Sequence, residues 1–221
     1  MTATREARFD GTFDGFREEA RALLTKGVPP EVVVWVAEDD AQDTLPGLLA
    51  PVSHPPAPRA GAHGTPHVPR ELMTLAEHAA CHRDPHRFTL LYRVIWRVVH
   101  EDYALLTHRD DEDVAQLHTL ERAVMREVAH LDRHLAFHVE SRARGDHLVA
   151  YARPHHHVLR LLAPRLAERF RGQPWSVLTP TESVHGDGHG VHFGPGVPED
   201  ILESAPHVAD GALDRRLWQE K

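Results

Sequence analysis

The stretch DEDVAQLHTLERAVMREVAHLDRHL, residues 111–135, decides the fold. Its apolar residues recur at steps of three and four, which is the spacing of one face of an α-helix. They are Leu117, Leu120, Val124, Val128, Leu131 and Leu135. We therefore expect one long helix that buries this stripe.

A second row of side chains runs along the same helix beside the apolar stripe. It consists of His118, Arg122, Arg126, His130 and His134, which follow one another at steps of four and so share one face. A straight row of cationic or protonatable side chains has the shape needed to follow a phosphate backbone. The row therefore indicates a surface for nucleic acid.

Two other interpretations of this row stay open. In the first, it is an ordinary solvated helix face whose arginines pair with nearby acids, namely Glu121, Glu127 and Asp132. In the second, His130 and His134 chelate zinc together with His138, but we expect the chain to have become a strand by residue 138. Histidine groups also arise by composition alone in a chain with 20 histidines. We therefore predict no resident metal and no other cofactor.

Shorter elements surround the long helix. Upstream, apolar spacing predicts helices over residues 13–26, 72–80 and 88–99, and a β-branched run predicts a strand over residues 32–36. Gly27 and Pro85 are expected to end the first two helices.

Downstream of residue 135 the period changes from helical to alternating. The pattern predicts a hairpin over residues 135–151, a helix over residues 158–170 that Pro164 bends, and a strand over residues 175–178. Residues 186–196 form a loop or a hairpin, and a loosely attached helix follows Pro198. We expect an α+β protein, dominated by helices, with a small and mostly antiparallel sheet built from the hairpin and the strands at Trp175 and Phe193.

Composition divides the chain into four parts. Residues 46–69 hold seven of the 17 prolines and almost no large apolar residue, which is typical of a linker. This linker separates a strand–helix–strand module, residues 1–45, from a main domain, residues 70–197. An acidic tail, residues 198–221, completes the chain.

The composition also excludes several classes of protein. The stretch nearest to a membrane span, around Val32 to Val36, is far shorter than the roughly 20 apolar residues that a bilayer requires. The charged residues 1–10 do not resemble a secretory signal, so we expect a cytoplasmic protein. The single cysteine, Cys81, excludes an internal disulfide and a cysteine-built zinc or iron–sulfur site.

The net charge of −8 conceals a basic segment. Residues 117–171 hold ten arginines against six acids, a local charge of +4, and eight of the 20 histidines. If the chain contacts phosphates, we expect the contact there. Trp175 and Phe193 are candidates for stacking on the bases of a single strand. Ser176, Ser183 and Cys81 lie in no motif of nucleophilic catalysis.

Several segments, taken in order, resemble a known family. They are residues 9–16 (FDGTFDGF), 79–85 (AACHRDP), 153–156 (RPHH), 175–180 (WSVLTP) and 193–196 (FGPG), with Arg126 and His130 on the long helix. Together they are similar to DUF4130, a family of probable DNA-metabolism proteins. Its members accompany a radical-SAM repair protein and are sometimes fused to a uracil-DNA glycosylase domain.

The resemblance implies a role in DNA metabolism or repair. The implied partners are DNA, single-stranded or damaged, and a radical-SAM repair protein or a uracil-DNA glycosylase. We expect nucleic acid to be bound through a basic face of Arg122, Arg126, His130, His134, His155, His156 and Trp175. The alternatives are a metal- or histidine-dependent hydrolase acting on DNA and a non-catalytic adaptor for the repair partner.

Overall fold

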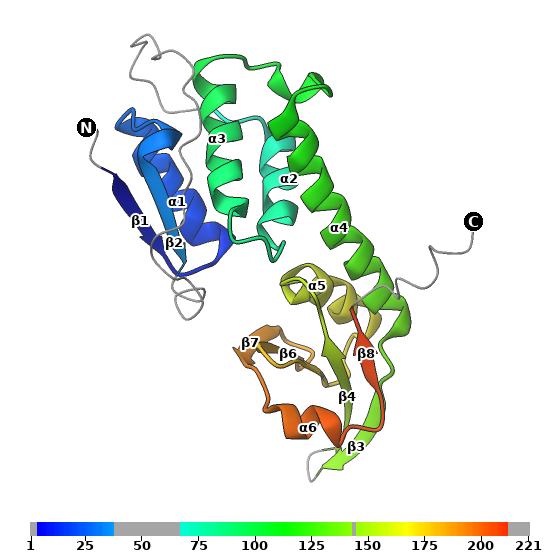
Figure 1. Ribbon diagram of the computed structural model, residues 1–221. Coiled ribbons are helices and arrows are strands. Elements are labelled where there is room, and N and C mark those ends of the chain that lie inside the picture. The colour runs from blue at the N-terminus through cyan, green and yellow to red at the C-terminus, as the bar shows by residue number, and fades with distance from the viewer. Residues whose placement is uncertain (1–3, 38–66, 143–144, 212–221) are drawn as a thin grey trace. The chain divides into compact units, whose positions relative to one another are not determined.

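The long helix predicted from the apolar stripe is present in the computed structural model as α4, Glu112–His134 (Figure 1). All six residues of the stripe are buried. Asp111 precedes the helix, and its carboxylate accepts the backbone N–H groups of Asp113 and Val114. These bonds satisfy donors that the first turn of a helix leaves without a partner.

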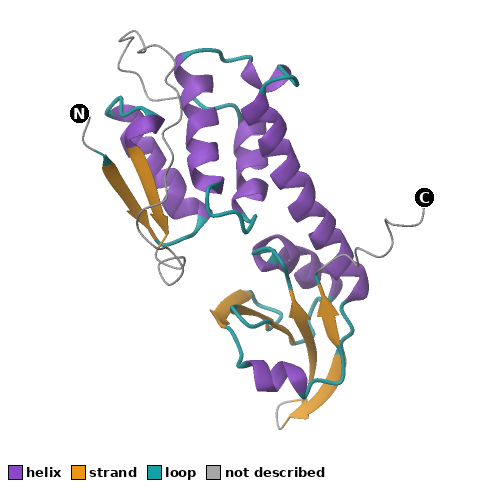
Figure 2. Cartoon of the chain, viewed as in Figure 1, coloured by secondary structure: helices purple, strands orange, loops and turns teal. Residues whose placement is uncertain are grey.

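The structure describes residues 4–37, 67–142 and 145–211. It is an α+β protein dominated by helices, as predicted (Figure 2). Residues 46–66 of the expected linker lie outside the described ranges. None of the helices in those ranges is long and apolar enough to cross a membrane.

The chain divides into two units. Unit 1 comprises Met1–Ala80 and Asp84–Glu121, and unit 2 comprises Cys81–Arg83 and Arg122–Lys221. The division falls inside α4, whereas composition placed the boundaries at the linker and at residue 198.

Unit 1 contains a small parallel sheet and helices. Its elements are β1 (Arg5–Phe9), α1 (Phe13–Thr25), β2 (Val33–Ala37), α2 (Arg70–Ala80), α3 (Arg87–His100), the start of α4, and short 3-10 turns at Pro30–Val32 and Leu105–Thr107. The two strands pair in parallel, because α1 returns the chain to the end of the sheet where β1 began. Gly27 follows α1 with a φ of 65°, a conformation that favours glycine and ends the helix.

Aromatic rings build the core of unit 1. Phe88 lies 4.7 Å from Phe9 and 5.1 Å from Phe16 between ring centroids. Arg87 is 3% exposed, and its guanidinium donates to the carbonyls of Ala80 and Asp84. The buried charge thereby fixes the turn between α2 and α3.

Unit 2 contains the main sheet. Its elements after α4 are β3 (His138–Arg142), β4 (Gly145–Arg153), α5 (Leu159–Arg169), β5 (Trp175–Leu178), β6 (Glu182–Gly186), β7 (Val191–Pro195), α6 (Glu199–Glu203) and β8 (Val208–Asp210). The strand order is β3-β4-β5-β6-β7, and β8 also pairs with β4. The predicted hairpin and the strand at Trp175 are therefore confirmed. Residues 186–196, expected as a loop or a hairpin, belong to a hairpin whose first strand begins at Glu182.

The expectation of a mostly antiparallel sheet needs one correction, because the sheet is mixed. The pairs β3–β4, β5–β6 and β6–β7 are antiparallel, but β4 pairs in parallel with both β5 and β8. Helix α5 connects β4 to β5, and a crossover helix leaves the strands that it joins parallel. The second parallel strand, β8, has three residues and too little alternation to be predicted.

Candidate nucleic-acid interface

Four members of the predicted row lie on the part of α4 that belongs to unit 2. Arg122, Arg126 and His134 are exposed, and His130 is half-buried. The rings of His130 and His134 stack at 4.3 Å. His130 also lies with Nε2 3.1 Å from the carbonyl oxygen of Asp210, which connects α4 to the end of β8.

The acids that the solvated-face interpretation assigned to the arginines have other partners. Asp132 pairs with Arg165 at 3.5 Å, and Glu121 pairs with His78 at 3.6 Å. Arg126 forms no ion pair with any residue that the structure describes; its Nε donates to a backbone carbonyl one turn earlier at 3.3 Å. An exposed guanidinium therefore stands on this face without an ion-pair partner among the residues that the structure describes.

Glu127 is buried, with 2% of its surface exposed. Its two carboxylate oxygens accept the backbone N–H groups of His155 at 2.5 Å and His156 at 2.8 Å. Gly211 packs against it so closely that a Cβ there would lie 1.9 Å from Oε1. Burial raises the pKa of this carboxyl, although the two N–H groups oppose the rise. Glu127 therefore anchors the loop after β4 to α4.

That loop meets the turn after α2 in a group that we call the histidine–arginine cluster: His82, Arg83, His155 and His156. Arg83 places Nη1 2.9 Å from Nδ1 of His155, and its backbone N–H donates to Nδ1 of His156 at 3.3 Å. The rings of His82 and His156 lie 4.2 Å apart. Residues more than 70 positions apart in the sequence thus form one group.

His156 is half-buried among basic groups in this cluster. Burial and the neighbouring His82, His155, Arg83 and His157 lower the pKa of His156 to about 3. His156 is therefore neutral near pH 7. Because its Nδ1 accepts a hydrogen bond, its proton resides on Nε2. Within the described ranges, Arg83 makes no ion pair.

Helix α5 begins immediately after the cluster. Its first turn contains no acidic residue, and Val158 at its N-terminus provides no side-chain cap. The N-terminal end of a helix carries a partial positive charge that favours anions. This partial positive charge at the start of α5 adds to the positive charge of Arg83 in the cluster.

Trp175 was predicted to lie on the nucleic-acid-binding face, but the structure places it in the core. It is 1% exposed in the core of unit 2, beside Gly186, where an added Cβ would lie 2.2 Å from the indole Nε1. A ring buried in this way cannot stack on a base without opening the core. Among the described residues of this unit, Phe193 is an exposed aromatic ring, with 40% of its surface accessible.

A family model matches residues 85–211, more than half of the chain, and is described as a domain of unknown function, DUF4130. The protein belongs to the DUF4130 family. The match extends from α3 to β8 and includes every residue of the predicted face, whereas His82 and Arg83 lie just before it. No curated protein and no solved structure matches the chain significantly.

The DUF4130 region also contains a hydrogen-bonded chain that sequence reasoning missed. Ser176 Oγ lies 2.7 Å from both Nε2 of His147 and Nδ1 of His185, and His185 Nε2 lies 3.0 Å from Ser183 Oγ. Both serines are nearly buried, at 4% and 3% exposure. The sequence showed histidines near these serines, but only the pairing of β4, β5 and β6 brings the four groups together.

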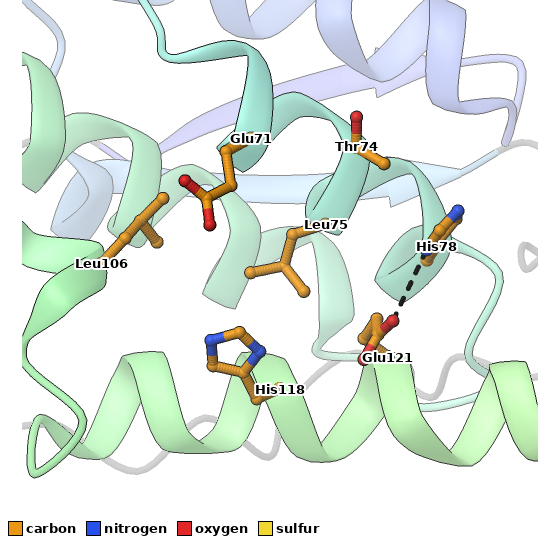
Figure 3. Close-up of a pocket in the computed structure, with 7 residues that line it drawn as sticks. All are labelled: Glu71, Thr74, Leu75, His78, Leu106, His118 and Glu121. Atoms are coloured by element: carbon orange, nitrogen blue, oxygen red, sulfur yellow. Dashed lines mark ion pairs between the residues drawn. The ribbon is translucent and has the colours of Figure 1, made fainter.

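His118, the first member of the predicted row, belongs to unit 1 and lines a separate pocket there (Figure 3). The pocket has a volume of about 420 Å³ and is lined by Glu71, Thr74, Leu75, His78, Leu106, His118 and Glu121. His78 and Glu121 form an ion pair in its wall. Among the residues placed by the structure, no group of three or more His, Cys, Asp or Glu is arranged to hold a metal ion.

Proposed function

We propose that this DUF4130 protein binds the phosphate backbone of DNA through one face of unit 2. This face, the phosphate-binding surface, consists of Arg83, Arg122, Arg126 and His155. The observation that carries the proposal is the contact of Arg83 with His155, in a cluster where Arg83 has no carboxylate among the described residues. The Arg83 guanidinium donates to the His155 imidazole, and an anion from outside the chain would accept its remaining N–H donors.

Three other arginines of unit 2 provide a contrast. Arg153 pairs with Glu199, Arg165 with Asp132 and Arg171 with Glu168. Within the described ranges Arg83 and Arg126 form no such ion pair, in a chain whose net charge is −8. Charge that is concentrated locally against the net charge is typical of a functional surface.

The geometry suits a polyanion with repeated phosphates. Arg122 and Arg126 are one turn apart on α4, and so about 6 Å apart along the helix axis. A guanidinium matches phosphate oxygens with two parallel N–H donors. The start of α5 offers backbone N–H groups to the same kind of anion.

The biological setting of this binding is also part of the proposal. A role in DNA metabolism or repair, beside a radical-SAM repair protein or a uracil-DNA glycosylase, rests on the family resemblance. An adaptor role would use the same partners, with weak binding of DNA by the protein alone.

A hydrolase acting on DNA is a second candidate, favoured by one observation. Ser176 contacts two imidazoles, and a serine nucleophile requires such a base. Ser176 is 4% exposed, so catalysis would require this part of the sheet to open. Release of nucleotides from labelled DNA by wild type, and its loss in Ser176→Ala, would favour this candidate.

Binding of a labelled oligonucleotide at several salt concentrations tests the main proposal. The double variant Arg83→Ala/Arg126→Ala removes two phosphate contacts, so the slope of log K against log salt should flatten by about 1.4 on a single strand. Arg165→Ala/Arg171→Ala is the matched control, because it removes the same charge from arginines paired with acids. Equal slopes for the two double variants, or no binding by the wild type, would reject the proposal.

A further inference from the structure

Phe193 stands at the edge of the main sheet. It lies on β7, the last strand in the order β3-β4-β5-β6-β7, and pairs with Val184 on β6. Residues paired across antiparallel strands project to the same side. Val184 is fully buried, yet Phe193 is 40% exposed, because β7 has no further strand beside it in that order.

Arg160 covers one face of this ring. Its guanidinium carbon lies 4.9 Å from the ring centroid, within the range of a cation–π contact. Arg160 itself is exposed, and it forms no ion pair with the residues of the described ranges. The contact places a cation over one face of a ring that is 40% exposed.

Arg160, one member of this pair, lies close in sequence to the histidines of the phosphate-binding surface. Arg160 is the second residue of α5, and only Val158 and Leu159 separate it from the histidine run that ends at His157. Both intervening side chains are fully buried, so the spacing between the cluster and Arg160 is fixed by the core. The Arg160–Phe193 pair therefore begins five residues after His155 of the cluster.

We infer that Phe193 and Arg160 form a stacking position for an unpaired base, so that the DNA bound by this protein is single-stranded. The inference rests on the proposed function and specifies its substrate. Bases stack on exposed rings and on guanidinium planes irrespective of sequence. In a duplex the bases are stacked on one another and leave no face for Phe193.

Two nucleic-acid probes of equal length distinguish base stacking from phosphate binding. One is an oligothymidylate, and the other is a chain of abasic sugar phosphates, which has no bases to stack. Phe193→Leu removes the ring but keeps an apolar side chain, and Phe193→Tyr keeps the ring as the matched control. We expect Phe193→Leu to bind the oligothymidylate about 5- to 100-fold more weakly and the abasic strand as the wild type does. Phe193→Tyr should bind both strands normally.

The ring can also be observed directly in the wild type. Its NMR signals should shift on addition of oligothymidylate and not on addition of the abasic strand, which keeps the test independent of how well Phe193→Leu folds. Unchanged signals, or equal weakening of Phe193→Leu for both strands, would overturn the inference. Failure of the wild type to bind the abasic strand would instead reject the phosphate proposal, and ring-dependent binding of oligothymidylate would then still support stacking.

Discussion

Oε2 of Glu127 accepts the backbone N–H of His156 at 2.8 Å, so a buried side chain of α4 determines the position of the loop that carries the histidines. The other carboxylate oxygen holds the adjacent backbone N–H in the same way. One residue of the long helix thereby connects the row on α4 with the histidine–arginine cluster. The phosphate-binding surface depends on this link.

Replacing Glu127 with alanine should destabilise unit 2. Two backbone N–H groups would lose their acceptor, and each unsatisfied buried donor costs about 1–3 kcal/mol. Urea denaturation should therefore show a free energy of unfolding lower by at least about 1 kcal/mol. Glu168→Ala is the control, because Glu168 is exposed and pairs with Arg171 one turn away on the surface. Equal stability of the two variants would contradict the anchoring role.

His156 should reduce stability in acid. Its folded pKa is about 3 against an ordinary 6.5, so between these values the unfolded chain binds a proton that the folded chain does not. The free energy of unfolding should therefore fall as pH decreases through this window, and less so in His156→Gln. The difference between wild type and variant should be constant above about pH 7.

Direct titration of the His156 ring by NMR provides an independent check. The ring should stay neutral at pH 5, with its proton on Nε2. Any tightening of DNA binding between pH 8 and 6 must therefore come from other histidines. A midpoint near 6.5 for this ring would show that it is not buried among these basic groups as the structure places it.

Gly186 should not tolerate a side chain. An added Cβ would lie 2.2 Å from Nε1 of Trp175, so Gly186→Ala must displace a large buried ring. Overpacking of this kind costs about 1–3 kcal/mol. Gly190→Ala is the matched control, because its Cβ would have 3.7 Å to the nearest atom. Thermal unfolding should separate the two variants; equal midpoints would place Trp175 outside the core.

Much of the fold could be predicted from the sequence, because the spacing of apolar residues shows which face of a helix or strand is buried. The stripe from Leu117 to Leu135 predicted α4 almost to the residue, since six buried positions at steps of three and four have one explanation. The apolar residues Trp175 and Val177 lie two positions apart, which predicts that both face the core; Ser176 between them is also buried. Had this spacing been applied, it would have placed Trp175 in the core with Val177.

The rest depends on contacts between distant parts of the chain. Arg83 and His155 are 72 positions apart, and no local pattern indicates that they meet. The parallel pairing of β4 with β8 is equally non-local, and β8 is too short for alternation to reveal it. His155 and His156 were predicted as site residues, whereas His82 and Arg83 were recognised only as part of the family resemblance.

NMR of the wild-type protein with a single-stranded oligonucleotide tests the location of the phosphate-binding surface most directly. The side-chain signals of Arg83, Arg126 and His155 should shift in a saturable way, and those of Arg171 should not. Added salt should reverse the shifts, because they report phosphate contacts. Shifts confined to other parts of the protein, such as His78 and His118 in the unit 1 pocket, or no shifts at all, would contradict the account.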